Sequence, residues 1–146
     1  MFAWLELRTH CHATEEEEKV VKAINFLAPG IKVARQRTEG FHRNPIIVLV
    51  ARTNSKNMMK DFWRLLDGHG LVSRVLECGA KSVDEDGILH FRLGKQDAYA
   101  EKAVLTEGED VVAVRLKIIR YPSQKDSLFD LAKHTVMELT GGHAPH

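Results

Sequence analysis

The chain has 146 residues, of which 44% are hydrophobic and 28% are charged, and its formal net charge is +1. This length suits one compact domain with its own core, and this composition excludes a disordered chain. No apolar run approaches the roughly 20 residues that cross a bilayer, and the start lacks the basic region of a signal peptide. We therefore expect a cytoplasmic protein with a single domain over residues 1–140 and a flexible tail over 141–146.

The first predicted elements are a strand and a helix. Residues 2–13 alternate in polarity, so Leu5, Leu7 and Cys11 are expected to face the core. The helix is expected to begin with a capping box formed by Thr14 and Glu17, and to end at Pro29–Gly30. The other face of the strand is predicted to carry Phe2, Trp4, Glu6, Arg8, His10 and His12.

Two further strands and a second helix are predicted next. A strand over 31–37 leads through a loop into residues 45–52, which hold the most apolar and β-branched run of the chain. Such a run is typical of a central strand buried on both faces. Asn54 or Ser55 is expected to cap the helix that follows. The spacing of Lys56, Lys60 and Arg64 places them on one outer face of that helix.

The second half of the chain predicts two short helices, two strands and a final helix. A helix is expected over 71–78, a strand over 88–93, a short helix over 95–102 and a strand over 111–121. Ser123 is the expected cap of the last helix. Cys11 and Cys78 have no CxxC spacing, which predicts free thiols rather than a disulfide.

This order of elements predicts an α+β fold. We expect a single-domain, two-layer sandwich in which a mixed, mainly antiparallel sheet is covered on one face by helices. The pattern contains no internal repeat and no low-complexity linker.

Positive charge is concentrated between Lys32 and Arg64. This stretch holds eight lysines and arginines against two acids, so its formal charge is +6, whereas the whole chain carries +1. Such asymmetry indicates a polyanionic partner.

The outward rows of three predicted strands also carry cationic and imidazole groups. If these strands share one sheet, its uncovered face can pair with phosphates, and Trp4 offers an aromatic surface for a base. An ordinary solvated sheet face is the alternative interpretation. The rows are Arg8, His10 and His12, then His90 and Arg92, then Arg115 and Lys117.

Catalytic and metal-binding patterns are missing from the sequence. His10 and His12 alternate on one side of a strand, but a zinc site needs three or four ligands and no CxxC or HExxH supplies the others. There is no GxSxG motif and no Gly-rich phosphate loop, and the predicted strands carry bases rather than the acids of a two-metal nuclease. We therefore expect no metal, no cofactor and no enzymatic activity.

Several segments together resemble an archaeal family of small RNA-binding proteins. They are HATEEEEKVVKAI (12–24), TEGFHRNPIIVL (38–49), KDFWRLL (60–66), LGKQDAY (93–99) and VRLKIIRYP (114–122). The family is described as a predicted exosome-associated subunit, and its fold is similar to that of the ribosomal protein that binds the five-S RNA. The resemblance implies a role in RNA processing or in ribosome- or exosome-related metabolism, with proteins of those assemblies as further partners.

Residues and resemblance together predict a non-catalytic protein that binds RNA phosphates through a basic surface. The alternative is a protein-interaction module, an adaptor or a dimerisation domain that uses an edge strand or an exposed Phe2 and Trp4. The predicted RNA-binding residues are Arg35, Arg37, His42, Arg43, Arg52, Lys56, Lys60, Arg64, Lys95, Arg115, Lys117 and Arg120.

Overall fold

A computed structural model describes residues 2–12, 14–39, 45–120 and 127–140, apart from the side chains of 38, 39, 45 and 79–82. The described elements are β1 (Phe2–Cys11), α1 (Glu17–Leu27), β2 (Val33–Glu39), β3 (Pro45–Thr53), α2 (Lys56–Gly68), α3 (Val72–Ser82), β4 (Ile88–Gly94), α4 (Lys95–Tyr99), β5 (Val111–Ile118) and α5 (Leu128–Leu139). None of these helices is both long and apolar enough to cross a membrane.

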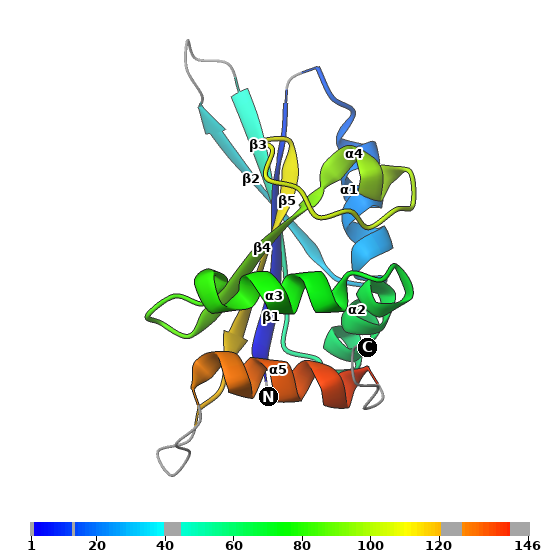
Figure 1. Ribbon diagram of the computed structural model, residues 1–146. Coiled ribbons are helices and arrows are strands. Elements are labelled where there is room, and N and C mark those ends of the chain that lie inside the picture. Colours follow the sequence, from blue (N-terminus) through cyan, green and yellow to red (C-terminus); the bar gives the residue numbers. More distant parts are fainter. Residues whose placement is uncertain (1, 13, 40–44, 121–126, 141–146) are drawn as a thin grey trace.

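The strands form one sheet in the order β2-β3-β1-β5-β4, and all four neighbouring pairs are antiparallel. The five helices lie together on one side of this sheet (Figure 1). The predicted α+β fold is therefore confirmed. The prediction allowed for a mixed sheet, but all the described strand pairs are antiparallel.

The position of the apolar run 45–50 differs from the prediction. It forms most of β3, which lies second from the edge, and the central strand is β1. Val48 and Leu49 are buried on opposite faces of the strand. Ile46 and Val50 lie on the face that no helix covers and are partly exposed, and Ile47 is partly exposed on the helix side. The prediction of a central strand buried on both faces is therefore wrong for this segment.

A bulge at the start of β1 changes the direction of its first residues. Phe2 pairs with Ile118 and Trp4 with Lys117, so Ala3 is an extra residue that has no partner in β5. Phe2 consequently faces the helices, is 3% exposed and stacks on Trp63 with ring centroids 5.8 Å apart. The prediction that Phe2 is exposed beside Trp4 is wrong, because simple alternation takes no account of a bulge.

The core lies between the sheet and the helices. Alternate residues of β1, β4 and β5 supply its lower layer, among them Leu5, Leu7 and Leu116. The upper layer comes from α2 with Phe62 and Trp63 and from the buried faces of the other helices. Cys11 is buried in this core and Cys78 is exposed, and the two do not form a disulfide with each other, as predicted.

The helix caps agree only in part with the predictions. Ser55 caps α2, since its hydroxyl accepts a hydrogen bond from the Met58 amide at 3.3 Å. The capping box at Thr14 is wrong, because α1 has Glu16 as its N-cap without a side-chain hydrogen bond. The N-cap of α5 is Ser127, not Ser123, which lies outside the described residues.

Lys95 joins three distant segments below the surface. Its ammonium lies 2.7 Å from Glu15 Oε1 and 2.6 Å from Asp110 Oδ1, and it donates to the His10 carbonyl at 2.9 Å. Lys95 is 2% exposed. Burial opposes its charge, but the hydrogen bonds to Asp110 and Glu15 outweigh burial and raise the pKa of Lys95. This ion cluster therefore ties α4 to the end of β1 and to the start of β5.

Replacing Lys95 by methionine should destabilise the fold. The substitution leaves two carboxylates without their shared counter-ion, which we expect to lower the free energy of unfolding by about 2–4 kcal/mol. Urea denaturation measures this loss. Lys102→Met is the matched control, since Lys102 is exposed and makes no side-chain ion pair with the described residues. An equal effect of both substitutions would contradict a stabilising role for Lys95.

The same cluster predicts the acid sensitivity of the fold. The hydrogen bond from Lys95 lowers the pKa of Asp110. Burial opposes ionisation of Glu15, but hydrogen bonds from Lys95 and the His12 amide lower its pKa overall. A lowered carboxyl pKa stabilises the folded state above the unfolded value and loses that contribution as the pH falls through the folded value.

The wild-type free energy of unfolding should therefore decline below the ordinary carboxyl values of 4.5 for glutamate and 3.8 for aspartate. Lys95→Met should decline less steeply, because its carboxyl groups have lost the partner that lowers their pKa. Urea titrations between about pH 7 and pH 3 measure both slopes. Parallel slopes for the wild type and Lys95→Met would contradict the linkage, and Lys102→Met should follow the wild type.

Candidate nucleic-acid interface

The strands direct a second set of side chains away from the helices, onto what we call the open face of the sheet. Cross-strand pairing places Arg52, Glu6, Arg115 and His90 in one row across β3, β1, β5 and β4. The charged, imidazole and aromatic residues of the open face are Trp4, Glu6, Arg8, His10, Arg52, His90, Arg92, Arg115 and Lys117.

Glu6 lies at the centre of the open face and is only 4% exposed. Its Oε2 accepts a hydrogen bond from Arg52 Nη2 at 2.9 Å and another from Arg115 Nη1 at 3.4 Å. A buried carboxylate is costly unless it is paired and hydrogen-bonded. Because the two arginines come from the strands on either side of β1, Glu6 holds two guanidinium groups together above the central strand.

Trp4 completes this cluster. The Arg52 guanidinium carbon lies 4.2 Å from the centroid of the Trp4 ring, and that of Arg115 lies 5.6 Å from it. A cation at such a distance is attracted to the electron-rich face of an indole. The cluster of Trp4, Glu6, Arg52 and Arg115 therefore presents planar aromatic and guanidinium groups from three neighbouring strands.

The open face carries an excess of positive charge. Among its described strand residues, Glu6 is the one acid, against four arginines and Lys117. Arg8 and Arg92 are exposed and make no ion pair with the described residues. Burial, together with the charge of Arg8, lowers the pKa of His10, so this imidazole is neutral at neutral pH. The free positive charge therefore comes from guanidinium groups.

Two groups near the start of β4 are engaged within the protein. Lys117 Nζ donates to the Asp86 carbonyl of the turn before β4. His90 Nε2 lies 2.7 Å from Asp84 Oδ2, and this hydrogen bond lowers the pKa of Asp84. Lys117 and His90 are thus less available to a ligand than Arg8 and Arg92.

The predicted helical cations lie in the other layer of the protein. Lys56, Lys60 and Arg64 belong to α2, which lies with the other helices on one side of the sheet (Figure 1). The buried side of α2 packs into the core through residues such as Phe62 and Trp63. The helix layer and the sheet separate them from the open face. The predicted basic residues therefore do not form a single continuous surface.

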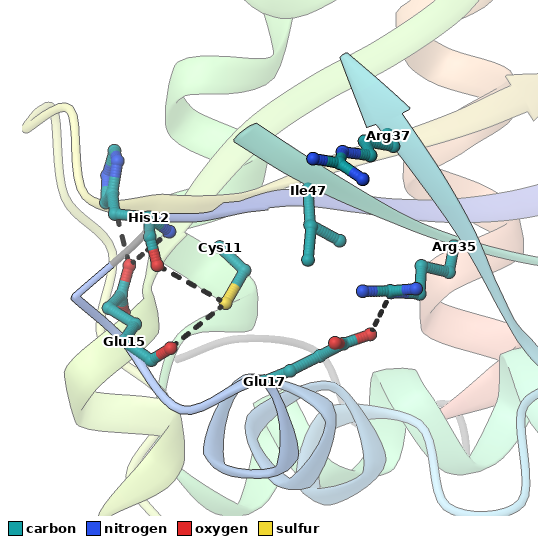
Figure 2. Close-up of a pocket in the computed structure, with 7 residues that line it drawn as sticks. All are labelled: Cys11, His12, Glu15, Glu17, Arg35, Arg37 and Ile47. Carbon is teal, nitrogen blue, oxygen red and sulfur yellow. Dashed lines mark hydrogen bonds and ion pairs between the residues drawn. The ribbon is translucent and has the colours of Figure 1, made fainter. Parts of the chain in front are cut away.

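Arg35 and Arg37 lie on the helix side of edge strand β2, at a pocket of about 400 Å³. Figure 2 shows Arg35 directed at Glu17, with Nε 2.7 Å from Oε1, and Arg37 beside Ile47. Glu15 also lines this pocket. Arg35 is thus paired with Glu17, and the pocket lining holds two carboxylates for its two arginines, so it has little net formal charge to attract an anion.

The remaining predicted residues lie in different environments. The Lys95 ammonium is buried between Glu15 and Asp110, so it is not accessible to a phosphate and we exclude it from the interface. Arg120 is exposed just after β5. His42 and Arg43 lie outside the described residues.

One group of possible metal ligands lies beside Lys95. Ligand atoms of His12, Glu15 and Asp110 are within 4.8 Å of one another. The Lys95 ammonium, however, already contacts both carboxylates. These acids therefore have a counter-ion supplied by the chain itself, and a metal ion would have to displace it.

The predicted list of binding residues omitted six residues that the open face brings together: Trp4, Glu6, Arg8, His10, His90 and Arg92. Strand alternation places all six on outward rows, and this was the signal that could have added them to the list. Their proximity depends on β1, β5 and β4 being neighbours, which is a long-range property of the chain.

Comparisons with known proteins identify the family of this chain. A family model described as RNA binding matches residues 4–118. An RNA-binding protein of Pyrococcus abyssi is 33% identical over 135 residues, covering 85% of this chain and 86% of that protein.

Solved structures of similar proteins share the fold. The crystal structure of a DUF54 protein from Archaeoglobus fulgidus has a TM-score of 0.81 at 31% identity, covering 92% of this chain and 99% of that one. A DUF54 protein from Methanothermobacter thermautotrophicus has a TM-score of 0.79 at 26% identity, covering 96% and 98%. On the match over residues 4–118 and the identity to the Pyrococcus protein, the chain belongs to the RNA-binding family.

Proposed function

We propose that the protein is a non-catalytic RNA-binding protein that holds a single RNA strand on the open face. The observation that carries this proposal is the cluster in which Glu6 fixes Arg52 and Arg115 beside Trp4. RNA recognition commonly uses unpaired bases that stack on aromatic rings or guanidinium planes. The cluster offers both kinds of surface next to cations that bind phosphate.

The arginines of the open face suit the phosphate backbone. A guanidinium has five N–H donors, so Arg52 and Arg115 keep free donors after each gives one hydrogen bond to Glu6. Arg8 and Arg92 lie one row away with no internal ion pair among the described residues. A strand of RNA that crosses the sheet would therefore meet guanidinium groups from β3, β1, β5 and β4 in turn.

The cations of α2 are the competing RNA surface. Lys56, Lys60 and Arg64 follow one another at helical spacing and point to solvent in full or in part. They lack an aromatic partner among the described contacts, and phosphate attraction is the interaction they offer. Arg35, Arg37, His42, Arg43, Lys117 and Arg120 are proposed as secondary contacts, since each carries or can carry positive charge.

The biological context remains a proposal that the family resemblance supports. It comprises RNA processing, or ribosome- or exosome-related metabolism, with proteins of those assemblies as partners. The alternative of a protein-interaction module relied in part on an exposed Phe2, and Phe2 is 3% exposed. Of the two aromatic residues proposed for a protein contact, only Trp4 is therefore left, and Arg52 already lies over its ring.

Neutralising Arg8 and Arg92 together should weaken RNA binding. The double variant Arg8→Gln, Arg92→Gln removes two free cations, so we expect roughly a tenfold lower affinity at low salt. The slope of log affinity against log salt should fall by about 1.4, since each single-strand phosphate contact contributes about 0.7. Filter binding of a short single-stranded RNA over a salt series measures both quantities.

The matched control is Lys60→Gln, Arg64→Gln on α2, which changes the net charge by the same amount on the helix layer. This control variant should have an RNA affinity and a salt slope close to those of the wild type. The opposite pattern, with loss in the α2 variant alone, would assign RNA binding to the helix layer and overturn the proposal for the open face. Urea denaturation of both variants checks that neither is unfolded.

A further inference from the structure

A pocket of about 630 Å³ opens beside Trp4, where β1 and β3 meet the start of α2. This volume is within the range of roughly 300–1,000 Å³ that is usual for small-molecule sites. The side chains that matter for its chemistry are Trp4, Lys32, Arg52, Asn54 and Met58.

The bulge in β1 lies at the edge of this pocket and separates Trp4 from Phe2. Ala3 is the extra residue, and it lines the pocket next to Trp4. Without it, regular alternation would place Phe2 and Trp4 on the same face of the sheet. Bulges commonly redirect a side chain at a functional site. Here the bulge sends Phe2 into the core and leaves Trp4 available on the open face.

The pocket combines a planar surface with hydrogen-bonding groups and cations. The Arg52 guanidinium carbon lies over the Trp4 ring, 4.2 Å from its centroid, and both residues line the pocket. Asn54 is exposed, and its carboxamide has no hydrogen bond to the described residues. Lys32 is exposed and has no ion pair among them. Met58 adds an apolar and adaptable contact.

The charge of this pocket separates it from the other pockets that contain arginine. None of its described lining residues is acidic, whereas Lys32 and Arg52 are cations. The pocket beside Arg35 contains Glu15 and Glu17. The groove of about 970 Å³ along β4 contains Glu77 and Glu107 beside three arginines. The Trp4 pocket thus joins a stacking surface to a lining that holds two cations and, among its described residues, no acid; of these cations Arg52 is paired with Glu6 and Lys32 has no ion pair among the described residues.

We propose that this pocket takes one unpaired nucleobase of the bound RNA strand. The base stacks on the pair formed by Trp4 and Arg52, its edge exchanges hydrogen bonds with the Asn54 carboxamide, and the adjacent phosphate lies against Lys32. This inference rests on the proposed function, because it needs RNA on the open face. It adds that the protein recognises a base as well as the charged backbone.

Tryptophan fluorescence tests the stacking directly. The chain has two tryptophans, and Trp63 is 0% exposed, so a ligand that stacks should quench Trp4 alone. An adenylate RNA of about eight nucleotides is a suitable probe, since it fits the site sizes of single-strand binders. Titration should quench the wild type, whereas Trp4→Leu, which retains Trp63, should show no quenching.

An abasic strand separates base recognition from phosphate binding. The wild type should bind the adenylate RNA roughly 5- to 150-fold more tightly than a ribose-phosphate strand of equal length that lacks bases, which corresponds to the stacking of one base. Trp4→Leu should bind both strands equally. Trp4→Phe keeps an aromatic ring and should retain most of the preference.

The outcomes distinguish this inference from the proposed function. Equal binding of both strands by the wild type, or an unchanged preference in Trp4→Leu, would overturn the base pocket, while salt-dependent binding would still support the open face. Failure of the wild type to bind either strand at low salt would overturn both. Quenching with a preference that depends on Trp4 would support both.

Discussion

The alternation of side chains along β1 is the constraint on which both faces of the molecule depend. Leu5 and Leu7 are fully buried under the helices, while Glu6 and Arg8 point to the open face. A shift of one residue in the pairing of β1 would exchange these sets and bury charged groups in the core. Because β1 is paired on both sides, the apolar core that stabilises the fold also fixes the orientation of the interface residues.

The buried carboxylate of Glu6 explains how flexible side chains become an ordered site. An unpaired buried carboxylate would cost several kcal/mol, and ordering a long arginine side chain costs about 1.5–2 kcal/mol. Pairing with Arg52 and Arg115 offsets the cost of burying the Glu6 carboxylate. It also means that the two arginine side chains are already ordered when the protein folds. The guanidinium groups therefore do not have to lose that freedom when RNA binds, which favours affinity through preorganisation. This preorganisation has a disadvantage, because the negative charge of Glu6 reduces the net positive charge of the open face.

Local patterns predicted the local features of this protein, and long-range features required the structure. The alternation of polar and apolar residues correctly predicted the faces of β1 from Trp4 to Cys11, and a serine before a helical pattern predicted the Ser55 cap. The apolar run at 45–50 indicated burial but could not reveal that β1 occupies the centre of the sheet. Lys95 resembled any other basic residue, because its partner Glu15 is 80 positions away in the chain. The bulge at Ala3 likewise depends on pairing with β5 and has no signal in the composition of β1.

Density of charge along the chain is a poor guide to density of charge on the surface. The basic stretch 32–64 is divided by the fold among the β2 pocket, the open face and the outer side of α2. The open face instead draws Arg8, Arg52, Arg92 and Arg115 from four strands. These arginines are brought together only when the sheet forms, and the one described acid among them is buried beneath its partners. The proposed interface is therefore a property of the folded sheet. The inserted alanine beside its proposed base pocket turns Phe2 into the core, so that Trp4 alone of this pair lies on the open face.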